Sequence, residues 1–135
     1  MRTGPYPDEA PQTPPAAGDL QAFVRKFDKE LAAGITALAL LAVLGAGEPL
    51  YGYQIAKRLE ELGEGVLAGK QSALYPVLRN LEGAGLLSSE VEPSVSGPPR
   101  RYYRITKPGR DVLRAWVAAW TATRDTVDQV LQGEL

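Results

Sequence analysis

The sequence contains neither cysteine nor histidine among its 135 residues. Disulfide bonds, thiolate nucleophiles, imidazole bases and the common zinc sites are therefore excluded. The most apolar stretch, residues 31–46, is shorter than the ~20 residues that a membrane-spanning helix requires. Hence we expect no metal, no cofactor and no membrane span.

Motifs of common enzyme sites are also missing. No glycine pattern that cradles phosphate and no nucleophile elbow occurs. Carboxylates are the remaining acid–base groups, and Glu60, Glu61 and Glu64 lack the apolar neighbours that tune a catalytic acid. We interpret them as the solvated side of a helix and do not expect an enzyme.

Charge is distributed unevenly along the chain, although the net charge is only −1. Residues 70–110 contain seven basic and three acidic side chains, a net charge of +4, whereas the rest of the chain carries −5. A basic segment inside an otherwise acidic chain indicates an anionic partner for that segment.

The N-terminal part of the chain divides into three segments. Residues 1–19 contain five prolines and no apolar period, so we expect a disordered tail there, although it does not resemble a signal peptide. Residues 20–31 have the spacing of an amphipathic helix. The apolar run 31–46 predicts a buried helix, which Gly34 breaks or bends away from the preceding segment.

The centre of the chain predicts two helices joined by a glycine-bearing link. Residues 52–62 and 71–82 both have helical apolar spacing, which is typical of a helix-turn-helix. Pro76 lies inside the second helix, and Gly83 and Gly85 end it. A short helix that ends so abruptly suits insertion into a groove of DNA.

A hairpin and a long helix complete the expected order. Residues 86–92 and 100–106 alternate as strands do, and the proline-rich segment 93–99 separates them as a flexible tip. Thr106 offers an N-cap for a final helix. Its apolar stripe consists of Leu113, Trp116, Val117, Trp120, Val127, Val130 and Leu131.

These elements predict a mainly α fold with a small β-hairpin, a winged helix-turn-helix with helices at both ends. The expected organisation is a disordered tail (1–19), an N-terminal helical segment (20–46), a winged helix-turn-helix DNA-binding domain (47–106) and a C-terminal helix (107–135). The stripe of the last helix is too large for a small domain to cover, so we expect a partner helix to cover it.

The sequence resembles the PadR family of bacterial transcriptional regulators, in its short type, which has a single C-terminal helix. The resemblance rests on "PLYGYQIAKRLEEL" (Pro49–Leu62), "SALYPVLRNLEGAGLL" (Ser72–Leu87) and "GPPRRYYRITKPGRDVL" (Gly97–Leu113). It implies a dimeric repressor whose "LYP" helix enters the major groove of double-stranded DNA, with the arginine-bearing wing nearby. It also implies that the N-terminal helical segment (20–46) and the C-terminal helix (107–135) build the dimer. Such a regulator works in the cytoplasm.

Two features depart from the family pattern. Family members often have Ser-Pro before the recognition helix, whereas this chain has "AGKQS" (Ala68–Ser72). The tail and the segment from Phe23 to Phe27 extend beyond the usual start of the family. The resemblance therefore implies no function for either feature.

On the recognition helix we expect Gln71, Ser72, Tyr75 and Arg79 to point outward. Arg79 is suited to guanine or to phosphate, and Gln71 to adenine. Two alternatives stay open: Arg79 forms a salt bridge with Glu82 or Glu60, and Tyr75 packs against the turn.

In the wing, Arg100 and Arg101 lie nearest the tip and are the expected phosphate contacts. Lys70 and Lys107 are candidate additions. Alternation places Arg100 and Arg101 on opposite faces, and the pattern leaves open which face covers the core. For Tyr51 and Tyr53, packing and phosphate contact both remain open.

The last helix allows two interpretations. Trp116 and Trp120 either fill the dimer interface or, as the family resemblance implies for Trp120, stack on a small planar hydrophobic effector. The function expected is therefore a homodimeric, ligand-responsive repressor that recognises a pseudo-palindromic operator. The alternatives are a winged-helix module that binds proteins and not DNA, and a ligand carrier.

Overall fold

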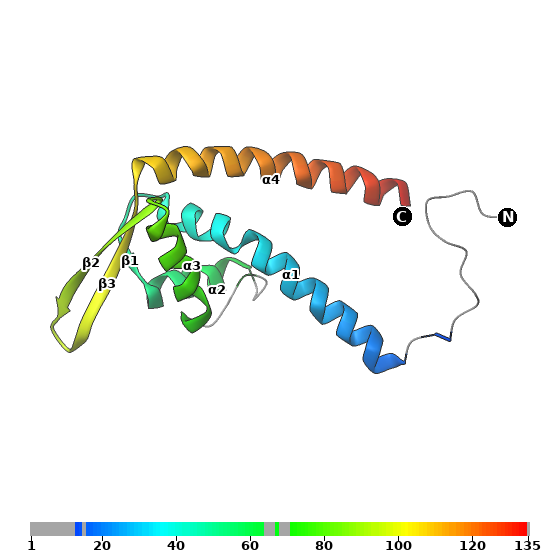
Figure 1. The fold of residues 1–135 in the computed structure, drawn as a ribbon, viewed down its shortest axis with the longest axis horizontal. Coiled ribbons are helices and arrows are strands. Elements are labelled where there is room, and N and C mark those ends of the chain that lie inside the picture. Colours follow the sequence, from blue (N-terminus) through cyan, green and yellow to red (C-terminus); the bar gives the residue numbers. More distant parts are fainter. Residues whose placement is uncertain (1–12, 15, 64–66, 68–70, 135) are drawn as a thin grey trace. The chain divides into compact units, whose positions relative to one another are not determined.

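The structure, a computed structural model, describes residues 13–14, 16–63, 67 and 71–134. The elements follow in the order α1 (Ala17–Leu44), β1 (Leu50–Tyr51), α2 (Gly52–Gly63), α3 (Gln71–Gly83), β2 (Leu87–Ser94), β3 (Gly97–Ile105) and α4 (Lys107–Glu134), as Figure 1 shows. This order confirms the predicted mainly helical fold with a winged hairpin. The chain divides into two compact units, residues 1–31 and residues 32–135.

The first unit contains the N-terminal part of α1. The helix begins at Ala17, three residues before the expected start, so the expected tail is shorter than predicted. Most of that tail lies outside the described residues. The apolar stripe is present on the helix, and its large side chains are exposed: Leu20, Phe23, Val24, Phe27 and Leu31.

Of the two outcomes predicted for Gly34, a break or a bend, the break does not occur, because α1 contains this residue in its interior and ends only at Leu44. A glycine costs a helix interior only ~1 kcal/mol relative to alanine. Strong helix formers surround Gly34, which explains why the helix continues. The expected full burial of residues 31–46 is also wrong, since only Leu40, Leu41 and Leu44 of this run are buried.

One hydrophobic core holds the second unit together. Leu40, Leu41 and Leu44 of α1 meet side chains of α2, α3 and the sheet there. The helices α2 and α3 pack against each other, and α3 also packs against β2 (Figure 1). The remaining buried members are Leu50, Ile55, Leu59, Leu74, Leu78, Leu81, Leu87, Tyr103 and Ile105.

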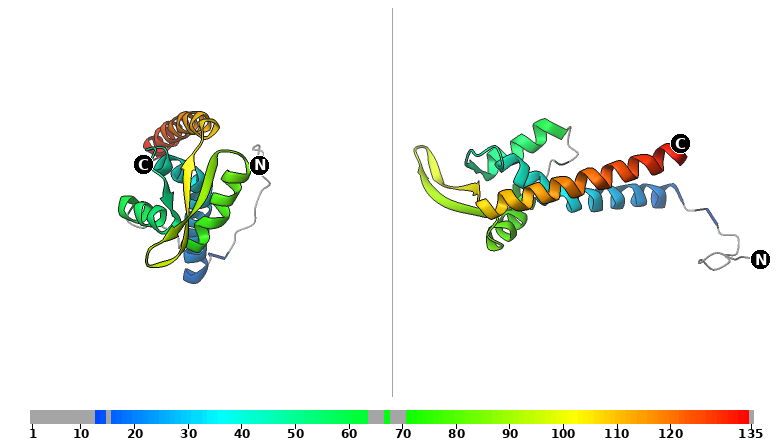
Figure 2. Two further views of the ribbon diagram at one scale, coloured as in Figure 1. Left: turned by 90° about the vertical axis from the view of Figure 1, so that its left-hand side faces the viewer. Right: turned by 90° about the horizontal axis from the view of Figure 1, so that it is seen from above.

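The sheet has three antiparallel strands in the order β1-β3-β2. Strand β1 was not predicted from the sequence, because two residues are too few to show a period. It pairs Leu50 with Tyr103 and Tyr51 with Tyr102. The right-hand view of Figure 2 shows the β2–β3 hairpin extending beyond α2 and α3.

The proline-rich tip is shorter than expected. Only Val95 and Ser96 separate the strands, so the prediction that residues 93–99 lie outside them is wrong. The ladder skips all three prolines, and its register shifts between Glu92 and Ser94. A strand tolerates proline at such an irregular position because no ladder hydrogen bond is lost there.

The chain turns sharply from α3 into the wing. The Gly85 amide donates to the Glu82 carbonyl and the Leu86 amide to the Leu81 carbonyl, both at 2.9 Å. Gly85 has φ +82°, a left-handed conformation that side chains disfavour. This pair of bonds is the Schellman motif that ends many helices, and it explains the predicted stop.

Candidate nucleic-acid interface

The exposed side of α3 carries a short polar surface. Ser72, Ala73, Pro76, Arg79 and Asn80 are exposed along one side of the helix. The opposite side is buried in the core. Because Pro76 lacks an amide hydrogen, the backbone bond that it would make to the preceding turn is absent, but the helix does not end there. The predicted helix over residues 71–82 is confirmed.

Arg79 extends from this surface without an acidic partner. The salt bridges considered with Glu82 and Glu60 do not form, and no carboxylate among the described residues pairs with Arg79. Its guanidinium therefore keeps its hydrogen-bond donors for another molecule. Five donors in one plane match a guanine edge or a phosphate.

Tyr75 does not point outward as expected. It is half-buried and packs against the core. A Cβ atom added to Gly52 would lie 2.6 Å from the Tyr75 hydroxyl oxygen, so α2 can approach this ring closely only with glycine there. Gln71 is also half-buried, and its Nε2 donates to the Tyr75 hydroxyl at 2.7 Å. The two residues thus brace the start of α3, and Ser72 and Arg79 remain as its outward members.

Burial decides which face of the wing covers the core. Tyr103 and Ile105 are buried, so the face that Arg101 shares with them is the inner one. Burial, and then the nearby Glu82 carboxylate, raises the pKa of Tyr103 above its ordinary value of 10.0. Arg101 lies beyond this buried part of the strand and is exposed.

A hydrogen-bond chain links Arg101 to α3. Its Nη1 donates to Ser89 Oγ at 2.9 Å, and Ser89 Oγ donates to Glu82 Oε2 at 2.6 Å. The chain joins the last turn of α3 to both strands of the wing. Arg101 is therefore partly engaged within the protein, whereas its other guanidinium donors remain exposed.

Arg100 lies on the outer face of the sheet, over aromatic rings. Its guanidinium carbon is 4.5 Å from the centre of the Tyr51 ring. Tyr102 meets Tyr51 edge to face at 5.3 Å, and Tyr53 stacks on it at 6.4 Å between ring centres. Lys57 Nζ lies 5.9 Å above Tyr53. We call the three rings the tyrosine platform.

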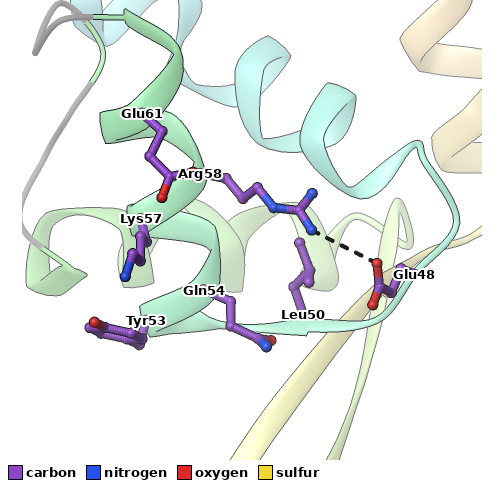
Figure 3. A pocket seen from close by; sticks show the side chains of 7 residues that line it. All are labelled: Glu48, Leu50, Tyr53, Gln54, Lys57, Arg58 and Glu61. Carbon is purple, nitrogen blue, oxygen red and sulfur yellow. Dashed lines mark ion pairs between the residues drawn. The ribbon is translucent and has the colours of Figure 1, made fainter.

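A small open pocket lies beside this platform (Figure 3). Its volume is about 140 Å³, and Tyr53 and Lys57 are at its edge. Glu48 and Arg58 form an ion pair across it at 3.8 Å, between well-exposed side chains. Two acidic and two basic residues line it, together with Leu50 and Gln54. The formal charges of these four residues sum to zero.

The two other candidate cations are Lys107 and Lys70, and Arg110 belongs to the same basic segment. Lys107 Nζ pairs with Asp111 at 3.3 Å on the same helix. Arg110 donates to the Gly45 carbonyl at 3.3 Å, which satisfies the end of α1. Lys70 lies outside the described residues.

The helix α4 begins as predicted and carries both tryptophans. The Gly109 amide donates to Thr106 Oγ1 at 3.1 Å, which confirms the N-cap. Trp116 is half-buried and packs against the core. Trp120 is 39% exposed, so the two candidate ligand-binding residues lie in different surroundings.

Sequence reasoning missed two features of this surface. Asn80 is exposed next to Arg79, and continuing the outward stripe by one residue would have found it. The contact of Tyr51 with Arg100 depends on strand β1, which gave no sequence signal.

Comparisons with known proteins agree with this geometry. A crystal structure of a PadR family transcriptional regulator from Eggerthella lenta is 36% identical, covers 85% of this chain and 97% of its own, and has a TM-score of 0.74. A PadR-like transcriptional regulator from Bacillus cereus is 26% identical over 76% of this chain and 97% of its own, with a TM-score of 0.66. An uncharacterised protein from Lysinibacillus sphaericus is 28% identical over 62% of this chain and 76% of its own.

No helix in the described part of the chain is long and apolar enough to span a membrane. The model of the transcriptional regulator PadR-like family matches residues 40–115, which include α2, α3, the whole sheet and the start of α4. This match covers more than half of the chain and contains the exposed surface of α3 and the wing. The chain therefore belongs to the PadR-like family of transcriptional regulators, which implies DNA-binding regulation.

Proposed function

We propose that this regulator is a homodimeric repressor that places α3 in the major groove of double-stranded DNA. The observation that carries the proposal is the polar side of α3, where Arg79 has no acidic partner among the described residues. Ser72 and Asn80 flank it with further hydrogen-bonding groups. Arginine reads guanine and asparagine reads adenine in that groove.

The wing supplies the backbone contacts in this proposal. Arg100 and Arg101 are exposed on opposite faces of the hairpin. Each face of the wing therefore offers one arginine that can bind a backbone phosphate. Such contacts carry no sequence information, but they fix the position of the reading helix. Lys70, which precedes α3 in the sequence, is a further candidate for this role.

The dimer is proposed from the part of α4 that follows Trp116. Its apolar side chains are 39–59% exposed in the single chain: Val117, Trp120, Val127, Val130 and Leu131. An exposed apolar stripe of this kind marks a protein interface. Two-fold pairing would carry two copies of α3 to successive major grooves, so the operator half-sites should lie about 10 bp apart.

An effector is proposed for the same region. Trp120 offers a partly exposed ring on which a small planar hydrophobic molecule can stack. Such a molecule releases DNA only if it binds more tightly to a dimer whose recognition helices are displaced, because equal affinity for both states shifts nothing. A regulator of this kind acts in the cytoplasm, where its DNA is.

Arg79→Ala tests the DNA contact. The variant should lower affinity for a selected duplex by about 10- to 100-fold, which corresponds to the loss of one bidentate contact. Arg114→Ala is the matched control, since Arg114 is exposed on α4 and pairs with Asp111. Equal affinities of Arg79→Ala and the control would reject the role of α3. A chain that shifts no duplex at moderate salt would point to the protein-interaction alternative.

A further inference from the structure

The outer face of the sheet holds the guanidinium of Arg100, which forms no ion pair with any carboxylate in the described part of the chain. Arg100 is exposed, yet it lies 4.5 Å above the ring of Tyr51. Glu92 is its neighbour across the hairpin, but the two side chains form no ion pair. Tyr102 and Tyr53 contact the Tyr51 ring from two directions and so limit its movement.

Stacking leaves the hydrogen-bonding edge of a guanidinium free. The ring contacts the flat face of the group, whereas its five donors lie in the plane and can reach a phosphate in a bidentate way. An arginine held on a ring also loses less rotamer entropy when it binds than one that moves freely in water. The tyrosine platform therefore prepares Arg100 to bind an oxyanion.

We propose that the tyrosine platform positions Arg100 to grip a backbone phosphate of double-stranded DNA, outside the segment that α3 reads. Tyr51 is the positioning residue, and Lys57 above Tyr53 adds a second cation to the same surface. DNA is favoured over an acidic protein because Arg101 is exposed on the other face of the same strand. A polyanion beside the hairpin can meet both. The inference rests on the proposed function.

A double-mutant cycle tests this role. Dissociation constants are measured at a series of salt concentrations for Arg100→Ala, Tyr51→Leu and the double variant, on a duplex selected from a random pool. Arg100→Ala should reduce the slope of log K against log salt by about 0.9, the value for one phosphate contact. Tyr51→Leu should weaken binding about two- to five-fold with an unchanged slope, since the charge remains. The double variant should bind no more weakly than Arg100→Ala alone.

Three further variants separate positioning from folding. Tyr51→Phe keeps the ring and should bind as the wild type does. Arg104→Ala removes another exposed charge from the same face of β3, on the side of Tyr102 opposite to Arg100, and should also bind normally. Arg100→Lys keeps the charge but loses the planar group, so it should bind more weakly at an unchanged slope. Because Arg100 is exposed, this last variant stays informative even if Tyr51→Leu unfolds.

The outcomes distinguish this inference from the proposed function. If Arg79→Ala weakens binding while Arg100→Ala and Arg100→Lys do not, the platform has no DNA role and the inference is overturned alone. Additive effects in the cycle would overturn the positioning role of Tyr51. If the wild-type chain binds no duplex, the proposed function fails, and the inference fails with it.

Discussion

The two halves of α4 carry one apolar stripe in two different environments. In the inner half, Val112, Leu113 and Trp116 pack against the core of the second unit. In the outer half, Val127 and Leu131 are each 47% exposed. The period of the sequence is the same in both halves. It therefore predicts which side of a helix is apolar, but it does not predict what covers that side.

The inner half of α4 contributes to folding, and in our proposal the outer half contributes to assembly. The inner half belongs to a core that the chain closes by itself, with Leu40, Leu41, Leu44, Ile55 and Leu78 fully buried. The outer half is exposed within the second unit, and in our proposal a second copy of the chain covers it. Substitutions in the two regions should thus change different measured quantities.

The largest effect is expected inside the core. Leu78→Ala should lower the free energy of unfolding by about 2–5 kcal/mol, because it leaves a cavity at a fully buried site of α3. Val95→Ala, at the exposed turn of the wing, is the control and should change it by less than about 0.5 kcal/mol. Urea denaturation at one protein concentration measures both. Equal stabilities would contradict the assignment of the core.

The next effect is expected in the outer half of α4. Val127→Asp combined with Leu131→Asp should weaken self-association at least about a hundredfold, since each subunit loses two apolar contacts and gains two charges at the interface. The control, Ala122→Asp with Gln129→Asp, adds the same charges on the opposite side of the helix, where both residues are exposed.

Sedimentation equilibrium measures this association, and circular dichroism reports whether the helices persist. A dimer as tight as the wild type would contradict the proposed interface. The proposed interface would also be contradicted if the control variant, Ala122→Asp with Gln129→Asp, lost its helices at high dilution.

A smaller effect on the free energy of unfolding is expected within the second unit, where a hydrogen-bond chain links α3 to the wing. Ser89→Ala removes the hydroxyl that joins Glu82 to Arg101, and it should lower the free energy of unfolding by about 1 kcal/mol. Ser88→Ala, on the exposed face of the same strand, should leave it unchanged. Chemical denaturation of both variants gives the difference. A larger loss in Ser88→Ala would show that the link between α3 and the wing has been misassigned.

The smallest effect concerns alkaline pH. The pKa of Tyr103 is raised in the folded chain, chiefly by burial. Its contribution to stability is therefore complete below pH 10.0, the ordinary tyrosine value, and is lost as the pH rises through the higher folded pKa. The wild type should lose more stability above pH 10.0 than Tyr103→Phe does. Parallel pH profiles in denaturation experiments would contradict this.

Local chemistry explains what could be predicted from the sequence. Thr106 as an N-cap and Gly85 as a helix stop act on their immediate neighbours, so their roles were readable in the chain. The spacing of Leu74, Leu78 and Leu81 likewise predicted the buried side of α3. These signals depend on residues within a few positions of one another.

Contacts between distant segments could not be predicted. Tyr75 is covered because α2 comes close at Gly52, and Arg101 is engaged because Ser89 lies on the neighbouring strand. The face of β3 that meets the core followed only from the burial of Tyr103. Alternation gives two faces to every strand, and tertiary packing chooses between them.

Selection of duplexes from a random pool tests the central claim most directly, because it examines DNA recognition and two-fold assembly together. The account predicts enrichment of an inverted repeat whose half-sites are centred about 10 bp apart. Enrichment of a single, unrepeated half-site, or of no sequence at all, would contradict it.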